Sequence, residues 1–89
     1  MKNVIAETDI IETLVSEIKR DFPRAKKNSF NNDEDLFDKG IIDSMGLLSI
    51  IGFIESEYSI TVADEDVIPD NFSSIDAMRK YILRHLPDK

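Results

Sequence analysis

The residues best placed to do chemistry lie in a short stretch, residues 40–46, which reads Gly-Ile-Ile-Asp-Ser-Met-Gly. This stretch joins a polar, acidic segment to an apolar segment with helical spacing, so Ser44 lies at or next to the start of a helix. A serine hydroxyl can act as a nucleophile or carry a covalent group. Asp and Ser are also favoured N-cap residues, so Asp43 and Ser44 have a purely structural interpretation as well. From this pair alone, helix capping is the simpler explanation.

A hydrolytic role for Ser44 is not expected. Hydrolases of one large class present the nucleophile in a G-x-S-x-G turn between a strand and a helix. Residues 42–46 read Ile-Asp-Ser-Met-Gly, and no strand pattern precedes them. The single histidine, His85, lies near the C-terminus, and the bases close to Ser44 in sequence are carboxylates. The sequence therefore gives no support for a Ser-His-Asp triad.

The acidic segment before Gly40 could be a calcium loop, but its spacing is wrong. An EF-hand needs D-x-[DN]-x-[DN]-G and a Glu at position twelve. A loop that starts at Asp35 has Gly40 at position six, but it has Lys39 at five and Gly46 at twelve. The register that starts at Asn31 also lacks essential ligands. We therefore expect a solvated acidic loop and no metal site.

Composition narrows the possible partners and location. The net charge is −7, from 18 acidic and 11 basic residues, which disfavours nucleic acid and favours basic partner proteins. The chain has no cysteine, so it has no disulfide and no thiol of its own. The longest apolar run, Leu47–Ile54, is far below the roughly 18 residues of a membrane span. Glu7 and Asp9 fall where a signal peptide would have its apolar core. We expect a soluble, cytoplasmic monomer with a single domain, residues 1–89.

Apolar spacing predicts the first helix from about Val4 or Thr8 to Asp21. Asp9 and Glu12 have the spacing of a capping box. Pro23 should stop the helix, because it disfavours helical backbone at the residue before it. The buried face is expected to consist of Ile10, Leu14 and Ile18, widened by Ile11, Val15 and Phe22.

A long connection, Arg24–Ile42, follows. It begins basic, becomes polar and ends acidic. Connections of this length are usually functional or held by their own apolar residues. The residues expected to hold this one are Phe30, Leu36, Phe37, Ile41 and Ile42. Gly40 indicates a turn with positive φ.

The second helix is predicted from Ser44 to Tyr58. One face of it should be buried, because apolar residues recur at helical spacing: Leu47, Ile50, Ile51, Ile54 and Tyr58. Met45, Leu48 and Gly52 form a narrower line beside that face. Pattern alone leaves open whether this line is buried or contacts a partner.

The remaining chain predicts one short and one long helix. Ile60–Val62 should be extended or form a brief turn, and Ala63–Val67 a single helical turn that ends at Pro69. Ser73, with Asp76 three residues later, is expected to cap the last helix. The buried face of that helix should include Ile75, Met78, Ile82 and Leu86, and Pro87 should end it. The fold class is therefore all-α.

Residues 36–45, Leu-Phe-Asp-Lys-Gly-Ile-Ile-Asp-Ser-Met, resemble the 4′-phosphopantetheine attachment motif of acyl carrier proteins. That motif has apolar pairs around a Gly and then Asp-Ser-Leu at the start of the second helix. The resemblance covers essentially the whole chain, and it implies a four-helix bundle with three main helices, a short third helix and a long first loop. Met45 replaces the usual Leu, and Gly46 follows it. This Asp-Ser-Met-Gly version is similar to D-alanyl carrier proteins, and the absence of acids early in the second helix argues against a fatty-acid synthase partnership.

The resemblance implies a carrier without catalytic activity of its own. Ser44 would receive phosphopantetheine from coenzyme A through a Mg²⁺-dependent phosphopantetheinyl transferase, which Asp43 would help to bind. The arm would hold an acyl or aminoacyl group as a thioester, loaded by a ligase and passed to acyl-transfer enzymes. Met45, Leu48 and Gly52 would form the partner contact, with Glu55 at its rim. Packing of these residues against the first loop is the alternative.

Two alternatives for the function stay open. The chain could be a D-alanyl, other aminoacyl or peptidyl carrier, because enzymes that act on the arm choose the cargo. It could also be an unmodified helical adaptor that binds a partner through the same apolar line.

Overall fold

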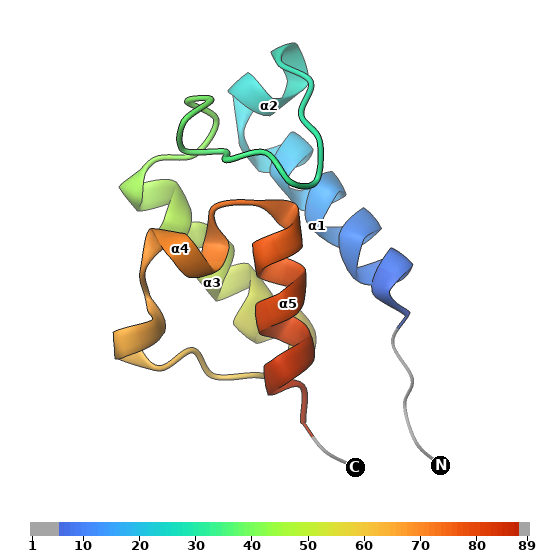
Figure 1. Cartoon of the computed structure of the whole chain (residues 1–89), viewed down its shortest axis with the longest axis vertical. Helices are drawn as coiled ribbons and strands as arrows, with labels where there is room; N and C mark the ends of the chain where they lie inside the picture. Colours follow the sequence, from blue (N-terminus) through green and yellow to red (C-terminus); the bar gives the residue numbers. More distant parts are fainter. Residues whose placement is uncertain (1–5, 88–89) are drawn as a thin grey trace.

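The computed structural model describes residues 6–87, and these residues form helices and connections without a strand. The elements in chain order are α1 (Glu7–Asp21), α2 (Pro23–Lys27), α3 (Ser44–Tyr58), the 3₁₀ turn η1 (Asp64–Asp66), α4 (Pro69–Phe72) and α5 (Ile75–His85). Figure 1 shows α1, α3 and α5 as the three long helices, and α5 packs against both α1 and α4. The predicted all-α fold is confirmed.

Helix α1 has the predicted buried face, with Ile10, Leu14 and Ile18 almost fully buried. Asp9 and Glu12, which have capping-box spacing, do not cap the helix, which extends upstream of them. The helix already begins at Glu7, and its N-cap, Ala6, has no side-chain capping bond. Of the two starting points considered, Val4 lies outside the described residues. The end at Asp21 is as predicted.

Two short helices were not predicted, and both begin at a proline. Phe22 is extended, with φ −117° and ψ 106°, and α2 starts at the next residue, Pro23. Helix α4 starts at Pro69 in the same way. Proline ends the preceding helix, but it also suits the first helical position, where its missing N–H loses no hydrogen bond. The prediction used only the first of these two properties.

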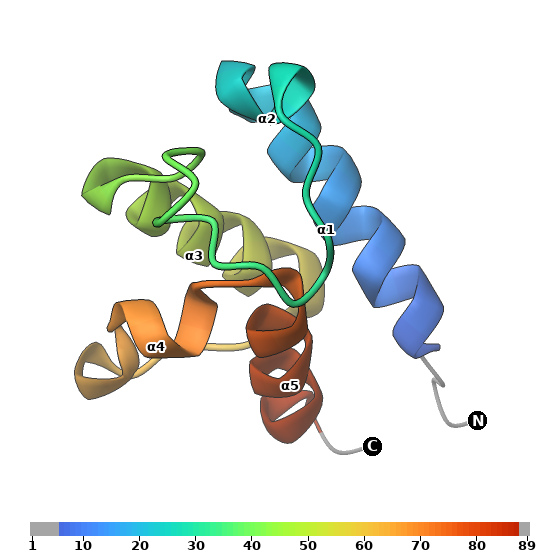
Figure 2. The ribbon, with the colours of Figure 1, turned by 45° about the horizontal axis from the view of Figure 1, so that its top comes forward.

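The connection between α2 and α3 is held to the core as predicted. Leu36, Ile41 and Ile42 are buried, and Phe30 and Phe37 are partly buried against the core. The loop is also bonded to the C-terminal half of the chain. The Leu36 N–H donates to the Ser73 carbonyl at 2.7 Å, and the Asp76 N–H donates to the Asn32 carbonyl at 2.9 Å. Figure 2 shows this connection passing across the top of α5.

Side-chain bonds organise the acidic part of this loop. Asp35 Oδ1 accepts the N–H groups of Phe37 and Asp38 at 2.9 and 3.1 Å. Glu34 Oε1 accepts the Asn31 N–H at 2.6 Å, and this bond is the main reason that the pKa of Glu34 is lowered. Within residues 6–87 no group of three or more acidic or histidine side chains is arranged to hold a metal ion. The Glu34 and Asp35 carboxylates accept backbone N–H groups of the loop itself.

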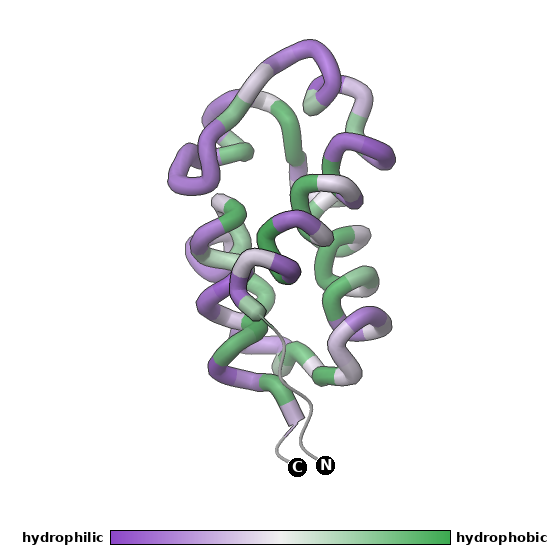
Figure 3. The backbone as a smooth tube through the Cα atoms, turned by 90° about the vertical axis from the view of Figure 1, so that its right-hand side faces the viewer, coloured by the Kyte–Doolittle hydropathy of each residue, from purple (hydrophilic) through white to green (hydrophobic). Residues whose placement is uncertain are grey.

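Helix α3 has the predicted bounds. The predicted face is buried along its whole length, with Leu47, Ile50, Ile51, Ile54 and Tyr58 in the core. The helix ends at Ser59, which takes the left-handed conformation with φ 57°. Figure 3 shows the hydrophobic stretches along the helices, with the hydrophilic connection at the top of the molecule.

The segment after α3 contains the predicted turn, now seen as η1 within residues 63–67. It is fixed to α5 by Tyr81, whose hydroxyl donates to Asp66 Oδ2 at 2.8 Å. Burial, aided by this carboxylate, raises the pKa of Tyr81 to about 12. Tyr81 is almost fully buried, although the helical spacing did not single it out.

The predicted cap of α5 is wrong by one residue. Ser74, not Ser73, is the N-cap, and its Oγ accepts the Ala77 N–H at 3.0 Å. Ser73 instead follows the last residue of α4. Asp76 faces Arg79 at 3.5 Å and takes no part in a capping box. Ser73 and Ser74 are adjacent in the sequence. Because Ser73 is the C-cap of the unpredicted helix α4, the N-cap of α5 is Ser74.

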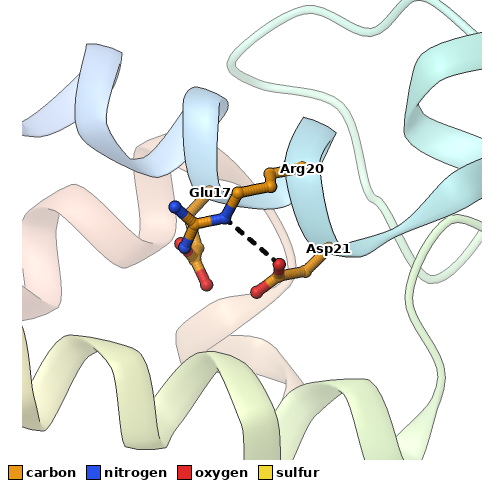
Figure 4. Close-up of polar contacts among 3 residues, drawn as sticks. All are labelled: Glu17, Arg20 and Asp21. Atoms are coloured by element: carbon orange, nitrogen blue, oxygen red, sulfur yellow. Dashed lines mark hydrogen bonds and ion pairs between the residues drawn. The ribbon is translucent and has the colours of Figure 1, made fainter.

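Surface ion pairs gather at the end of α1, as Figure 4 shows. Arg20 contacts Glu17, one turn before it, and lies 3.3 Å from the Asp21 carboxylate. Burial raises the pKa of Glu17, whereas a hydrogen bond with Glu17 is the main cause of the lowered pKa of Asp21. The Arg20 side chain is 71% exposed, so we expect about 0–1 kcal/mol from such pairs. Burial of apolar residues, not ion pairing, stabilises this end.

Candidate functional site

The candidate site is built on the first turn of α3. Asp43 is the N-cap, and its Oδ1 accepts the Gly46 N–H at 2.8 Å. The Asp43 carbonyl accepts the Leu47 N–H at 2.9 Å, which begins the helical ladder. Ser44 is the first helical residue and is exposed. Of the two capping candidates, Asp43 performs the capping and leaves the Ser44 hydroxyl on the surface.

The loop before Ser44 is fixed by one carbonyl group. The N–H groups of Ile41 and Ile42 both donate to the Leu36 carbonyl, at 2.9 and 3.2 Å. Gly40 makes the turn possible, because its φ of +73° is unfavourable for other residues. Both isoleucine side chains are buried. The direction from which the chain enters α3 is therefore set by the core.

Gly46 is the residue of this turn whose role sequence reasoning missed. A methyl group at its Cα would lie 2.6 Å from Phe22 Cε1 and 3.2 Å from Ile42 Cγ2. The aromatic ring at the α1–α2 junction thus packs directly onto the backbone of α3. This contact fixes the first turn of α3, and with it Ser44, to the end of α1. A glycine directly after an Asp-Ser-Met sequence was the only available signal.

The line beside the buried face of α3 points outward. Met45 is 80% exposed and Leu48 is 63% exposed, and a methyl group added to Gly52 would meet no atom within 4 Å. Pattern alone had left open whether these residues are buried, and they are not. Ile68, the N-cap of α4, is a further exposed large apolar residue.

Glu55 lies at a different kind of position. It is half-buried, and its Oε2 accepts the Val62 N–H at 2.8 Å. The carboxylate therefore holds the segment that leaves α3. The sequence had placed this residue at the rim of a partner surface, and the structure gives it a role within the fold.

His85 is engaged elsewhere. Its ring stacks on Tyr81 with centroids 4.0 Å apart, and Nδ1 lies 2.9 Å from the Tyr81 carbonyl oxygen. In Figures 1 and 2 the last turn of α5 lies well away from the start of α3. The structure thus does not bring His85 and Ser44 together.

The first turn of α3 can accommodate a covalently attached phosphate. The N–H groups at a helix start have no intrahelical acceptor and, with the helix dipole, favour an anion. This turn contains no acidic side chain, and the Asp43 carboxylate is turned to Gly46. A phosphodiester on the exposed Ser44 hydroxyl would therefore fit.

Comparison with known proteins identifies similar chains. The family model described as "Phosphopantetheine attachment site" matches residues 11–82. No helix in the described range is long and apolar enough to cross a membrane.

Three curated relatives are similar to parts of the chain. "Probable acyl carrier protein PigG" of Serratia sp. is 22% identical over 71 residues, which cover 80% of this chain and 82% of that protein. The "D-alanyl carrier protein" of Streptococcus suis is 41% identical over 54 residues, 61% of this chain and 66% of the relative. Its counterpart in Streptococcus mutans is 40% identical over 42 residues, 47% of this chain and 53% of the relative.

Proposed function

Because the chain belongs to the family of phosphopantetheine attachment domains, we propose that Ser44 is its attachment residue. The observation that carries this proposal is the exposed Ser44 hydroxyl at the start of α3, beside a cap that Asp43 supplies. The family's prosthetic group is 4′-phosphopantetheine, which supplies a thiol that can hold an acyl group as a thioester. The chain itself has no cysteine, so this thiol would be its only one.

The attachment step transfers the phosphopantetheinyl group from coenzyme A. The Ser44 Oγ forms a bond to phosphorus, the pyrophosphate P–O bond breaks, adenosine 3′,5′-bisphosphate leaves, and the serine proton passes to a base. A separate Mg²⁺-dependent phosphopantetheinyl transferase catalyses this step. Asp43 contributes by fixing the backbone at Ser44. We expect the loading to take place in the cytoplasm, where coenzyme A is available.

The protein would then act as a single carrier domain without catalytic activity of its own. An acyl- or aminoacyl-activating ligase would load the thiol, and acyl-transfer enzymes would unload it. The outward line of Met45, Leu48 and Gly52 supports this proposal, because an apolar surface at the base of the arm can bind such enzymes. Glu55 would contribute only at the rim, since its carboxylate already holds Val62.

A D-alanyl cargo is the second candidate function. It is favoured by the similarity to two D-alanyl carrier proteins, at 41% and 40% identity, against 22% for the acyl carrier protein of Serratia. Loading assays of the holo form with a D-alanine ligase and with a fatty acyl ligase would separate the two. Loading by the acyl ligase alone would exclude the D-alanyl role.

Mass spectrometry after coexpression with a phosphopantetheinyl transferase tests the attachment site. The wild type should gain one phosphopantetheine, and Ser44→Ala should gain none while its melting temperature stays nearly unchanged. Ser49→Ala, which changes another exposed serine of α3, is the matched control and should still be modified. Uptake of the group by Ser44→Ala would overturn the assignment. Failure of the wild type to be modified would favour an unmodified adaptor.

A further inference from the structure

A groove opens at Asp43, the residue before the proposed attachment residue Ser44, and neither Met45 nor Leu48 lines it. It has a volume of about 500 Å³, which lies within the range of roughly 300–1,000 Å³ that is typical of small-molecule sites. Its lining residues come from the α1–α2 junction and from the loop before α3: Phe22, Pro23, Arg24, Phe37, Gly40, Ile41, Ile42 and Asp43. One end of the groove is thus formed by Asp43, the residue bonded to Ser44.

The walls of this groove combine apolar and cationic groups. The rings of Phe22 and Phe37 are each only partly buried, so apolar surface faces the opening. Arg24 lies at the edge, where its Nη1 donates to the Gly40 carbonyl at 3.0 Å. None of the ion pairs among residues 6–87 includes Arg24. An arginine has five N–H donors, so this side chain can bind a further acceptor while it keeps its bond to Gly40.

We propose that this groove holds the pantetheine arm that Ser44 carries. The proposal rests on the attachment function proposed above. The arm includes a phosphodiester, a carbon bearing two methyl groups, a hydroxyl, two amides and a thiol. The methyl groups match the phenylalanine rings, and the phosphodiester or the first amide carbonyl matches the Arg24 guanidinium, because charge-assisted hydrogen bonds are the stronger ones.

Because the arm is tethered at Ser44, even weak affinity of the groove is enough to hold it. An arm attached at Ser44 samples the neighbouring surface at an effective concentration of about millimolar, so affinity that would be negligible for a free ligand still populates the bound state. The groove is open, and it therefore allows the arm to leave when a partner enzyme takes the cargo. Arm and partner would occupy separate surfaces, because Met45 and Leu48 do not line the groove.

The test uses the intact holo protein and nuclear Overhauser effects (NOEs) from the arm. With isotope-labelled protein and an unlabelled arm, filtered spectra should show NOEs from the arm methyl groups to the ring protons of Phe22 and Phe37. NOEs only to Met45, Leu48 or Ile68, or none to the protein, would overturn the proposal. These spectra are recorded on protein whose modification mass spectrometry has verified. An unmodified Ser44 thus contradicts the proposed function, whereas a modified Ser44 without these NOEs contradicts the groove alone.

Two matched variants test the role of Arg24. Arg24→Gln removes the charge at the groove, and Lys27→Gln removes one from the other end of α2, where Lys27 lines a separate hollow with Lys39. The methyl-to-ring NOEs should lose intensity in Arg24→Gln and keep it in Lys27→Gln. Equal loss in both variants, or no loss in either, would show that Arg24 does not hold the arm.

Discussion

Gly46 is buried and Gly52 is exposed on the same helix, and they meet very different surroundings. A methyl group at Gly46 would collide with Phe22, whereas one at Gly52 would meet open space. Glycine within a helix costs about 1 kcal/mol relative to alanine. At Gly46 the close packing of the Phe22 ring explains why glycine is present despite this cost. At Gly52 no neighbour within the described chain explains the glycine. The buried side of α3 is thus constrained by the fold, whereas the exposed side is open to the partner contact proposed above.

Among substitutions on the two sides of α3, one in the core should lower the free energy of unfolding most. Ile51 is buried in α3, so Ile51→Ala should leave a cavity and lower the free energy of unfolding by about 2–5 kcal/mol. Denaturant titration measures this change. A loss well below this range would mean that the buried side of α3 tolerates cavities and is not a close-packed face.

Gly46→Ala should have the next largest effect. Overpacking typically costs about 1–3 kcal/mol, and the better helix propensity of alanine returns about 1 kcal/mol. We therefore expect a net loss of up to about 2 kcal/mol, measured by thermal or denaturant unfolding. In a double-mutant cycle with Phe22→Leu the loss should shrink, because the smaller side chain removes the collision. Additive effects would show that Phe22 is not the cause.

Gly52→Ala is the matched change on the outer side and should have the opposite sign. With no neighbour within 4 Å, the helix-propensity gain of about 0.5–1 kcal/mol should appear without a penalty. The melting temperature should rise. If the variant is instead destabilised, the surroundings of Gly52 are more crowded than the structure shows, and the contrast between the two glycines fails.

Leu48→Glu should change the unfolding free energy least, because the Leu48 side chain is 63% exposed. Its effect should appear in partner binding. Interface anchors lose about 1–2 kcal/mol or more when disrupted, so loading by the cognate ligase should fall by about tenfold. Loading kinetics and a melting curve measure the two effects separately. Unfolding of this variant would place Leu48 in the core and contradict the proposed partner face.

Most of the fold and the position of Ser44 could be predicted from the sequence. The buried stripe from Leu47 to Tyr58 is long and regular, so periodicity determined both the type and the bounds of α3. The local sequence also predicted the turn at Gly40, because residues other than glycine rarely adopt a positive φ.

The misses share physical causes. Pro23 and Pro69 were interpreted only as helix ends, although each also begins a short helix. With α4 unseen, the cap of α5 was assigned to Ser73 instead of Ser74. The contact between Phe22 and Gly46 is tertiary, and no local pattern reveals it. The same holds for the bond from Tyr81 to Asp66 and for the groove beside Asp43.

Two backbone hydrogen bonds join the loop before α3 to the C-terminal half of the chain. Local unfolding of one segment is therefore coupled to local unfolding of the other. Leu36 donates to Ser73, and Asp76 donates to Asn32, so the loop can leave the core only when its bonds to the α4–α5 junction break. Amide hydrogen exchange at Leu36 and Asp76 would then report one shared local unfolding event. The order of the segment that presents Ser44 thus depends on the last helix of the chain.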